Sequence, residues 1–285
     1  MNVPFKVNLK DQVALVTGGG GVLCSTMAHA LSACGARIAV ADLKLEAAEA
    51  VAASIRKEGG TAIAVACNVL EKESLANANE KVKKELGSVD ILINGAGGNH
   101  PKGTTSAEYL LKEQLTNTNK DIITFYDLDP KGVEFVFNLN FLGTLLPTQA
   151  FTREMAGKGK GVVINISSMN AFRPLTKIPA YSGAKAAVSN FTQWLAVHFS
   201  RVGIRVNGIA PGFFVTDQNR TLLTKPDGSW TPRANTILAH TPMGKFGAAD
   251  DLTGTLLWLV SDEGAGFVTG VVIPVDGGFA AFSGV

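Results

Sequence analysis

A three-layer, doubly wound α/β fold around a parallel sheet is predicted by three features of the sequence. Short runs rich in Val, Ile and Ala alternate along the chain with longer segments of helical character. The runs are continuously apolar, as in strands buried on both faces, and helical crossovers between such strands make a sheet parallel. A glycine cluster follows the first run. Because such sheets bind ligands beyond the carboxyl ends of their strands, we expect the functional residues at that edge.

The strands and the first helices can be placed in order. Strands are expected at Gln12–Thr17, Arg37–Asp42, Thr61–Cys67, Val89–Asn94, Gly161–Ile166, Ile204–Ala210 and about Val271–Val275. Helical patterns cover Met27–Cys34, Leu45–Lys57 and Glu71–Leu86. The second pattern stops before Gly59 and the third before Gly87, because glycine commonly ends helices.

Two longer segments interrupt this alternation. Residues 98–129 form a polar insertion after the fourth strand, and residues 212–245, which include several prolines, form a lid after the sixth. Connections of this length are uncommon unless they are functional, so we expect both to cover the site. No linker or internal repeat divides the chain, and the sequence predicts a single domain spanning residues 1–285.

Charge and cysteine content exclude several classes of function. Lys and Arg number 26 and Asp and Glu 24, which offers no excess positive charge to nucleic acid or to a membrane surface. No apolar run reaches the roughly 18 residues of a membrane span, and the first residues hold no signal segment. Cys24, Cys34 and Cys67 lack C-x-x-C spacing, which favours reduced side chains and a cytoplasmic location. No residue spacing indicates a metal site.

The glycine cluster is typical of a dinucleotide-binding turn. Gly18 to Gly21 open a helix directly after a strand, so a pyrophosphate can approach the backbone and the positive helix N-terminus. Asp42 ends the second strand, where its carboxylate can accept hydrogen bonds from a ribose and would repel a 2′-phosphate. This favours NAD as cofactor, although Lys44 leaves NADP open. The alternatives are a structural tight turn and a helix-capping role for Asp42.

A second group of residues predicts proton transfer. Tyr181 and Lys185 are four residues apart in a helical run, which places both side chains on one face. A lysine ammonium beside a phenol stabilises phenolate, so we expect Lys185 to lower the pKa of Tyr181. Ser168 closes the fifth strand, where its hydroxyl could orient a carbonyl group. The alternative is a surface Tyr–Lys pair.

Taken in order, these motifs resemble the short-chain dehydrogenase/reductase family over essentially the whole chain. The matching pieces are Thr17–Gly21, Asp42, Cys67–Val69, Asn94–Gly97, Asn140, Ser168, Tyr181, Lys185, Pro211–Gly212 with Thr216, and Asp276–Gly278. The resemblance implies a Rossmann fold and an NAD(P)-dependent oxidoreductase acting on a CH–OH group. It also implies a homotetramer, with helices around Pro130–Met155 and Tyr181–Val202 packed across an interface.

The resemblance implies a role for each matched residue. Tyr181 would be the acid of reduction and the base of oxidation, and Ser168 would hold the substrate oxygen. Lys185 would bind the nicotinamide ribose and tune Tyr181, and Asn140 would position a water of a proton relay to Lys185. The cofactor would contact Gly18, Gly20, Gly21, Val22, Leu23, Asp42, Asn68, Val69, Asn94, Gly95, Ala96, Tyr181, Lys185, Pro211, Gly212, Val215 and Thr216.

Four positions depart from the family pattern. Val22 and Cys24 stand at the second and third glycines of T-G-x-x-x-G-x-G, Asn68 replaces the usual Asp, and Gly95 replaces the second Asn of N-N-A-G. We expect Gly21 to provide the close approach to the pyrophosphate instead.

Polar residues near the strand ends predict a polyhydroxylated, anionic substrate. They are Asn99, His100, Asn170, Arg173, Asn219 and Arg220, with Lys102 and Gln218 beside them. Arginine binds carboxylates in a bidentate fork, although each residue could instead be a solvated surface residue. The sequence is also similar to the family's D-mannonate oxidoreductase (fructuronate reductase) subgroup, which implies a sugar-acid substrate such as D-fructuronate or D-mannonate. A ketogluconate or polyol dehydrogenase, a 3-oxoacyl thioester reductase and a non-enzymatic dinucleotide sensor are the alternatives.

Overall fold

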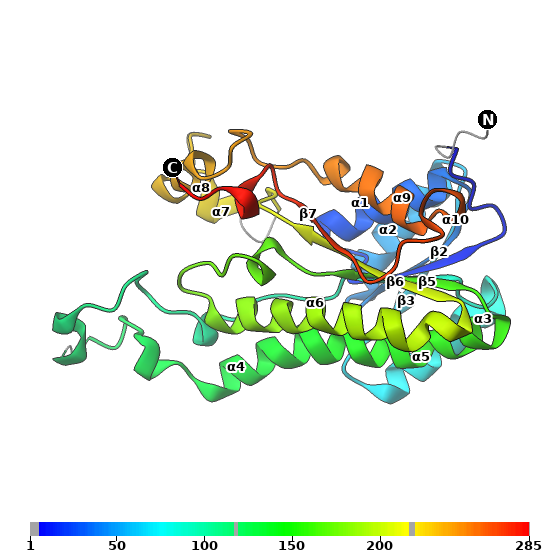
Figure 1. The fold of residues 1–285 in the computed structure, drawn as a ribbon, viewed down its shortest axis with the longest axis horizontal. Helices are drawn as coiled ribbons and strands as arrows, with labels where there is room; N and C mark the ends of the chain where they lie inside the picture. Colours follow the sequence, from blue (N-terminus) through cyan, green and yellow to red (C-terminus); the bar gives the residue numbers. More distant parts are fainter. Residues whose placement is uncertain (1–5, 117–118, 217–219, 285) are drawn as a thin grey trace.

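A parallel sheet of seven strands forms the centre of the molecule (Figure 1). The computed structural model describes residues 6–116, 119–216 and 220–284. The strand order is β3-β2-β1-β4-β5-β6-β7. The strands are β1 (Val13–Thr17), β2 (Arg37–Asp42), β3 (Thr61–Ala66), β4 (Ile91–Asn94), β5 (Gly161–Ile166), β6 (Ile204–Pro211) and β7 (Val272–Val275). The predicted strands and the doubly wound parallel fold are confirmed.

Helices cover both faces of this sheet. One layer contains α1 (Val22–Ala33), α2 (Leu45–Lys57), α9 (Thr253–Val260) and α10 (Asp262–Ala265), and the other contains α3 (Lys72–Glu85), α4 (Pro130–Phe137), α5 (Gly143–Lys158) and α6 (Pro179–Phe199). Leu15 packs in the core of one layer and Val16 in the core of the other, and both are fully buried. Since successive strand residues face opposite layers, both layers require apolar residues, which explains the continuous apolar runs.

The strand order reverses between β1 and β4, which are neighbours in the sheet. The segments that follow these two strands, Gly18–Gly21 and Gly95–Gly98, therefore lie beside each other at the carboxyl edge. Helix α1 starts at Val22, five residues before the predicted start at Met27, so it begins directly at the glycine turn. In open α/β sheets, ligands bind at such a reversal point.

The insertion after β4 does not fold over this edge as expected. Its first part forms the 3₁₀ turn η1 (Pro101–Gly103), which packs on α4 and α6, and the chain then projects beyond the N-terminal ends of those helices (Figure 1). The projecting part includes η2 (Lys112–Thr116) and η3 (Phe125–Asp127), and Tyr109 and Tyr126 are more than two-thirds exposed. Only the base of the insertion therefore borders the carboxyl edge of the sheet.

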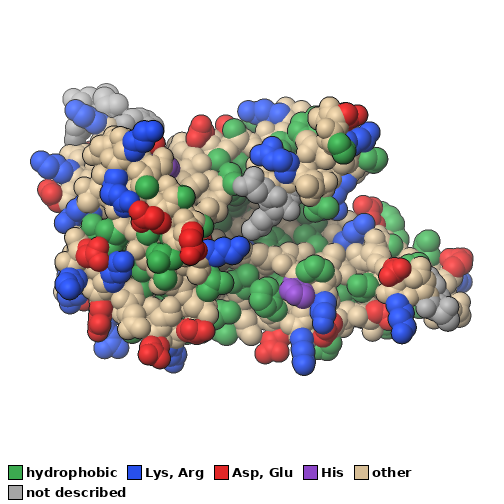
Figure 2. Space-filling view, turned by 180° about the vertical axis from the view of Figure 1, so that it is seen from behind, with side chains coloured by type: hydrophobic (Ala, Val, Ile, Leu, Met, Phe, Trp, Pro, Cys, Tyr) green, Lys and Arg blue, Asp and Glu red, His purple; other side chains and the backbone are tan. Residues whose placement is uncertain are grey.

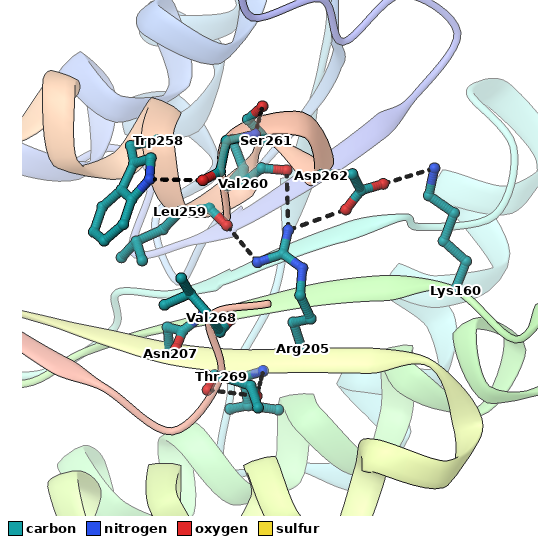
Figure 3. A network of polar contacts seen from close by, with 12 residues as sticks. Lys160, Arg205, Asn207, Trp258, Leu259, Val260, Ser261, Asp262, Val268 and Thr269 are labelled. Carbon is teal, nitrogen blue, oxygen red and sulfur yellow. Dashed lines mark hydrogen bonds and ion pairs between the residues drawn. The ribbon is translucent and has the colours of Figure 1, made fainter. Parts of the chain in front are cut away.

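A polar network anchors α9 and α10 to the amino end of β6, far from that edge (Figure 3). The Arg205 guanidinium donates to the carbonyl oxygens of Leu259 (2.8 Å) and Val260 (3.4 Å) and pairs with Asp262 (3.0 Å). Lys160, just before β5, pairs with the other carboxylate oxygen of Asp262 at 2.8 Å. Because Arg205 satisfies the last carbonyl groups of α9, it fixes this layer to the sheet.

The lid after β6 contains little regular structure among its described residues. The lid segment holds the short helices α7 (Arg220–Leu223) and α8 (Pro232–Ala239). All three cysteines are unpaired, and Cys24 and Cys67 are buried. Among the described helices, none combines the length and the apolar character needed to cross a membrane.

Candidate active site

The turn between β1 and α1 brings its backbone against the segment after β4 and against helix α2. Gly18 has a φ of +63°, and a Cβ on it would lie 3.0 Å from the backbone of Ala96. A Cβ on Gly20 would lie 2.6 Å from the Cβ of Ala47 in α2. Within the described residues no side chain caps α1, so the amide groups of its first turn are available to a ligand phosphate.

Asp42 lies at the end of β2 beside this turn. One carboxylate oxygen accepts a hydrogen bond from the Gly20 amide (3.1 Å) and the other from the Lys44 amide (3.0 Å). The residue that caps α2 is Lys44, not Asp42. The helix-capping alternative for Asp42 therefore does not describe its position, whereas its place beside the glycine turn suits contact with a ribose.

The substitutions at positions 24 and 95 compensate for each other. A Cβ on Gly95 would lie 2.2 Å from the Cys24 sulfur, so the thiol fills the space that a side chain at position 95 would need. The Thr17 hydroxyl accepts hydrogen bonds from the amides of Gly95 (3.1 Å) and Ala96 (3.3 Å), which ties the end of β1 to the segment after β4. Close packing of α1 on the sheet edge is thus kept without a glycine in the helix.

The three residues predicted to transfer a proton are brought together. Ser168 follows β5, and its hydroxyl oxygen accepts a hydrogen bond from the backbone amide of Asn170 at 3.2 Å. Tyr181, in the first turn of α6, makes a side-chain hydrogen bond with Ser168. Lys185 lies one turn further on the same face, with Nζ 5.7 Å from the centre of the Tyr181 ring and donating to the Ile166 carbonyl at 2.8 Å. The Tyr–Lys pair is therefore not a surface pair: Lys185 is buried.

Burial controls the protonation of this group. Desolvation raises the pKa of Tyr181 above its usual value, and the hydrogen bond from Ser168 opposes this only in part. Desolvation also lowers the pKa of Lys185 to about 8. The expected lowering of the Tyr181 pKa by Lys185 is not seen, because burial is the largest influence on this pKa and raises it. At neutral pH the phenol keeps its proton, which suits proton donation.

Asn140 lies next to Lys185 across a glycine. It is fully buried in a turn of π-helix, η4 (Asn138–Leu142), a feature frequent at functional sites. Its side-chain NH₂ donates to the carbonyl oxygens of Gly98 and Val136, both at 2.7 Å. A Cβ on Gly97 would lie 2.7 Å from the Asn140 side-chain oxygen and 3.2 Å from Lys185 Nζ. A side chain at position 97 would therefore collide with Asn140 and crowd Lys185.

A chain of buried hydroxyl and amide groups that sequence reasoning missed supports this arrangement. Thr144, Thr148 and Thr152 in α5 each donate to the carbonyl four residues earlier, and the first of these carbonyls is that of Asn140. The side-chain NH₂ of Asn94 donates to the Thr148 hydroxyl and to the side-chain oxygen of Asn165, both at 2.9 Å. The signal available in the sequence was the spacing of the threonines by four.

This bonding bears on Asn94, which the family resemblance places along the adenosine. Its side chain points into the layer between the sheet and α5, so only its backbone can line a ligand site. The other residues predicted to contact the cofactor follow strand ends. Val22 and Leu23 begin α1, Asn68 and Val69 follow β3, Ala96 follows β4, Pro211 ends β6, and Gly212, Val215 and Thr216 come next. Their contacts with a cofactor remain predictions.

The predicted substrate residues differ in their surroundings. Asn170 is buried beside Ser168, and the Arg173 Nε donates to the Ala280 carbonyl at 3.0 Å. Asn99 donates to Thr104, and the His100 ring packs on Phe135 with the ring centres 5.1 Å apart. Lys102 pairs with Asp129, and Arg220 begins α7. Gln218 and Asn219 lie outside the described residues.

The surface is hollowed between the lid and the base of the insertion, with hydrophobic side chains on its floor (Figure 2). A pocket of about 350 Å³ lies at the C-terminal end of β7 and is lined in part by Phe213, Met243 and Asp276. The residues Ser168, Tyr181 and Lys185 do not line that pocket. In the described part of the chain, no group of three or more His, Cys, Asp or Glu side chains is arranged to hold a metal ion.

Several known proteins are similar to this chain in sequence and architecture. The family model described as short chain dehydrogenase matches residues 12–227. A Haemophilus influenzae protein solved with bound NAD, provisionally described as a D-mannonate oxidoreductase, is 55% identical, with 100% of both chains covered and a TM-score of 0.92. An uncharacterized oxidoreductase of Bacillus subtilis is 48% identical, covering 99% of this chain and 100% of the relative. A gluconate 5-dehydrogenase of Burkholderia cenocepacia, solved with NADP and tartrate, is 28% identical, with 97% and 98% covered and a TM-score of 0.81.

Proposed function

This chain belongs to the short-chain dehydrogenase family, and on that basis we propose that it transfers a hydride between NAD and a keto or hydroxy group of a sugar acid. The observation that carries the proposal is the meeting of Ser168, Tyr181 and Lys185 at the carboxyl edge of the sheet, beside a glycine turn that excludes side chains. The intact set of three argues against a dinucleotide sensor without catalytic activity.

The residues around the glycine turn fit a dinucleotide. Side chains at Gly18 or Gly20 would collide with neighbouring elements, so glycine lets this turn pack tightly, and the first turn of α1, which no side chain of the described residues caps, offers its backbone amides to a pyrophosphate. The Asp42 carboxylate lies where an adenosine ribose would be held, and it favours NAD because it would repel a 2′-phosphate. The bound nicotinamide would supply the hydride for reduction or accept it in oxidation.

The side chains of the protein would handle the proton. In reduction, the Ser168 hydroxyl orients the substrate carbonyl oxygen, and the protonated Tyr181 phenol donates its proton to that oxygen. Lys185 has a pKa of about 8 and is therefore charged at neutral pH, so its ammonium group stabilises the phenolate that remains. Asn140, which lies beside Gly97 as Lys185 does, would hold a water of the relay through Lys185 that returns a proton to Tyr181. Oxidation runs through the same groups in reverse.

The sugar-acid part of the proposal has two supports. Relatives named for sugar acids cover essentially the whole chain, including one described as a D-mannonate oxidoreductase and one gluconate 5-dehydrogenase. Asn170 and Arg173 lie on the turn that follows Ser168, where they can bind hydroxyl and carboxylate groups. We therefore propose D-fructuronate and D-mannonate as the substrate pair. A ketogluconate is the nearest alternative because it offers the same groups.

We also propose that the chain assembles as a homotetramer through the outer face of α4 to α6. Phe137, Leu142, Trp194 and Val197 are exposed on these elements, and such an apolar face is typical of an interface. A Val197→Glu variant should dissociate the assembly in light-scattering measurements. An unchanged mass for that variant would argue against this face.

A substrate panel tests the function. Oxidation of NADH and NADPH would be followed with D-fructuronate, D-tagaturonate, 5-ketogluconate, an uncharged ketose and an acetoacetyl thioester. We expect the highest kcat/KM with a hexuronate and NADH. Turnover of the thioester alone, or of the ketose in preference to every acid, would contradict the proposal.

A further inference from the structure

We infer that the C-terminal tail, residues 276–284, positions Arg173 to bind a carboxylate group of the substrate. The Arg173 Nε donates a hydrogen bond to the Ala280 carbonyl at 3.0 Å, which joins segments 107 residues apart in sequence. The inference rests on the proposed function, since it names the group that would recognise the acid of a sugar-acid substrate.

The backbone of Arg173 lies close to Ser168. Ser168 is the N-cap of the 3₁₀ turn η5 (Met169–Ala171), and the Arg173 amide donates to the Met169 carbonyl at 3.0 Å. The backbone of Arg173 is therefore fixed relative to the Ser168 hydroxyl. A carboxylate a few bonds from a carbonyl held by Ser168 would lie within reach of this long side chain.

Hydrogen bonds from its backbone to Asp276 hold the tail in one conformation, which fixes the position of the Ala280 carbonyl. One oxygen of Asp276 accepts from the Gly278 amide (2.9 Å), and the other accepts from the Ala280 amide (2.8 Å). Gly277 and Gly278 have φ angles of +65° and +88°, which a side chain would strain. The 3₁₀ turn η8 (Phe279–Ala281) follows.

Two aromatic contacts attach this tail to the lid. The Phe279 ring meets the edge of Phe213 with the ring centres 5.3 Å apart, and the Phe282 ring meets His240 at 6.4 Å. The tail accordingly runs beside α7 and α8 (Figure 1). The hydrogen bond from Arg173 thus connects the turn after Ser168 to the lid through the tail.

The chemistry of the guanidinium group explains why this contact matters. A planar guanidinium offers five donors, and the two terminal nitrogens can bind a carboxylate in parallel. The Nε bond to Ala280 leaves those two nitrogens available, and among the described residues neither makes a hydrogen bond or an ion pair. Because the Nε contact already orients the plane of the group, binding a carboxylate costs less conformational entropy.

A matched pair of small ligands tests the inference. Tartrate and threitol share a four-carbon polyol skeleton, but only tartrate carries carboxylates. Their affinities for the complex with NADH would be measured from NADH fluorescence in the native chain, in a chain ending at Gly278, in Arg173→Lys and in the combined variant. Arg201→Lys serves as control, because Arg201 lies at the opposite edge of the sheet in η6 (Ser200–Val202).

We expect the native chain to bind tartrate at least about tenfold more tightly than threitol. The truncation and Arg173→Lys should each weaken tartrate binding by about 10- to 100-fold, with threitol and NADH affinities unchanged. The combined variant should lose no more than either single change, since both remove one arrangement. Asp276→Asn, which keeps one of the two acceptors for the tail, should give an intermediate loss.

Equal affinities for tartrate and threitol in the native chain would overturn the inference. So would a truncated chain that binds NADH normally and keeps its tartrate affinity, or additive losses in the combined variant. Because this readout does not need turnover, it is independent of the substrate panel. Preference for tartrate that depends on Arg173 and the tail, without turnover of any uronate, would support the inference and contradict the proposed substrate.

Discussion

The thiol of Cys24 occupies the space that any side chain at position 95 would enter: a Cβ on Gly95 would lie 2.2 Å from its sulfur. Cys24 is in the first turn of α1, and Gly95 directly follows β4. These two departures from the family pattern, 71 positions apart, therefore form one packing arrangement. The bulkier residue is on the helix, and the glycine follows the strand.

This relationship predicts a strong coupling between the two positions. Gly95→Ala should lower the free energy of unfolding by about 1–3 kcal/mol, because the core cannot accept the added carbon without moving. Cys24→Ala in the same chain should recover part of that loss, with a coupling of at least about 0.5 kcal/mol. The carbonyl oxygen of Thr17, 2.9 Å from the added carbon, limits the recovery.

Urea unfolding followed by circular dichroism at one protein concentration measures these values. Cys67→Ala is the matched control, because Cys67 is also buried but does not contact Gly95. A Gly95→Ala variant as stable as the native chain, or equal recovery by Cys67→Ala and Cys24→Ala, would show that the two positions are independent.

Asp42 should determine the choice of cofactor. Its carboxylate is held beside the glycine turn by two backbone amides, so a 2′-phosphate on the adenosine ribose would meet a fixed negative charge. Asp42→Ala should shift the ratio of kcat/KM for NADH to that for NADPH toward NADPH by at least about tenfold. Glu46→Ala, at an acidic residue in the first turn of α2, should leave the ratio unchanged. The same ratio in the Asp42 variant would assign the discrimination to another residue.

Removal of the Tyr181 hydroxyl should abolish most turnover without loss of the cofactor. Tyr181→Phe keeps the ring that packs in the small core cluster with Ala180 and Ala184. We expect kcat for keto reduction to fall by about 10²- to 10⁴-fold, the contribution of a positioned acid, while the Kd for NADH changes little. Tyr126→Phe, on the projecting insertion, controls for the substitution itself. Near-native turnover in the Tyr181 variant would assign the proton to another donor.

The sequence predicted the parallel sheet closely because the central strands β1, β4 and β5 are buried on both faces, and that burial requires a continuous apolar run. It also placed Ser168, Tyr181 and Lys185 together, since the ends of parallel strands meet at one edge. Two features could not be predicted in this way. The pKa of Tyr181 depends on how deeply its hydroxyl is buried, which spacing does not report. The contact between Arg173 and Ala280 joins two loops, and no periodic pattern relates loops distant in sequence.

The pKa of Lys185 predicts the pH dependence of reduction. Burial lowers this pKa from its ordinary value to about 8, so the ammonium form is present below pH 8 and is lost above it. Tyr181 does not limit the rate in this range, because burial raises its pKa and it keeps its proton. If the ammonium is required, kcat/KM for keto reduction should fall above pH 8, approaching about tenfold per pH unit.

The profile would be measured from pH 6 to 9.5 at constant ionic strength with NADH. Lys185→Arg provides the control, because an arginine in this position stays charged throughout that range. Its rate should be low, but its profile should lack the fall above pH 8. A native profile that stays flat to pH 9.5 would mean that the charge of Lys185 is not needed for the proton transfer by Tyr181. An identical fall in the arginine variant would assign the titration to a different group.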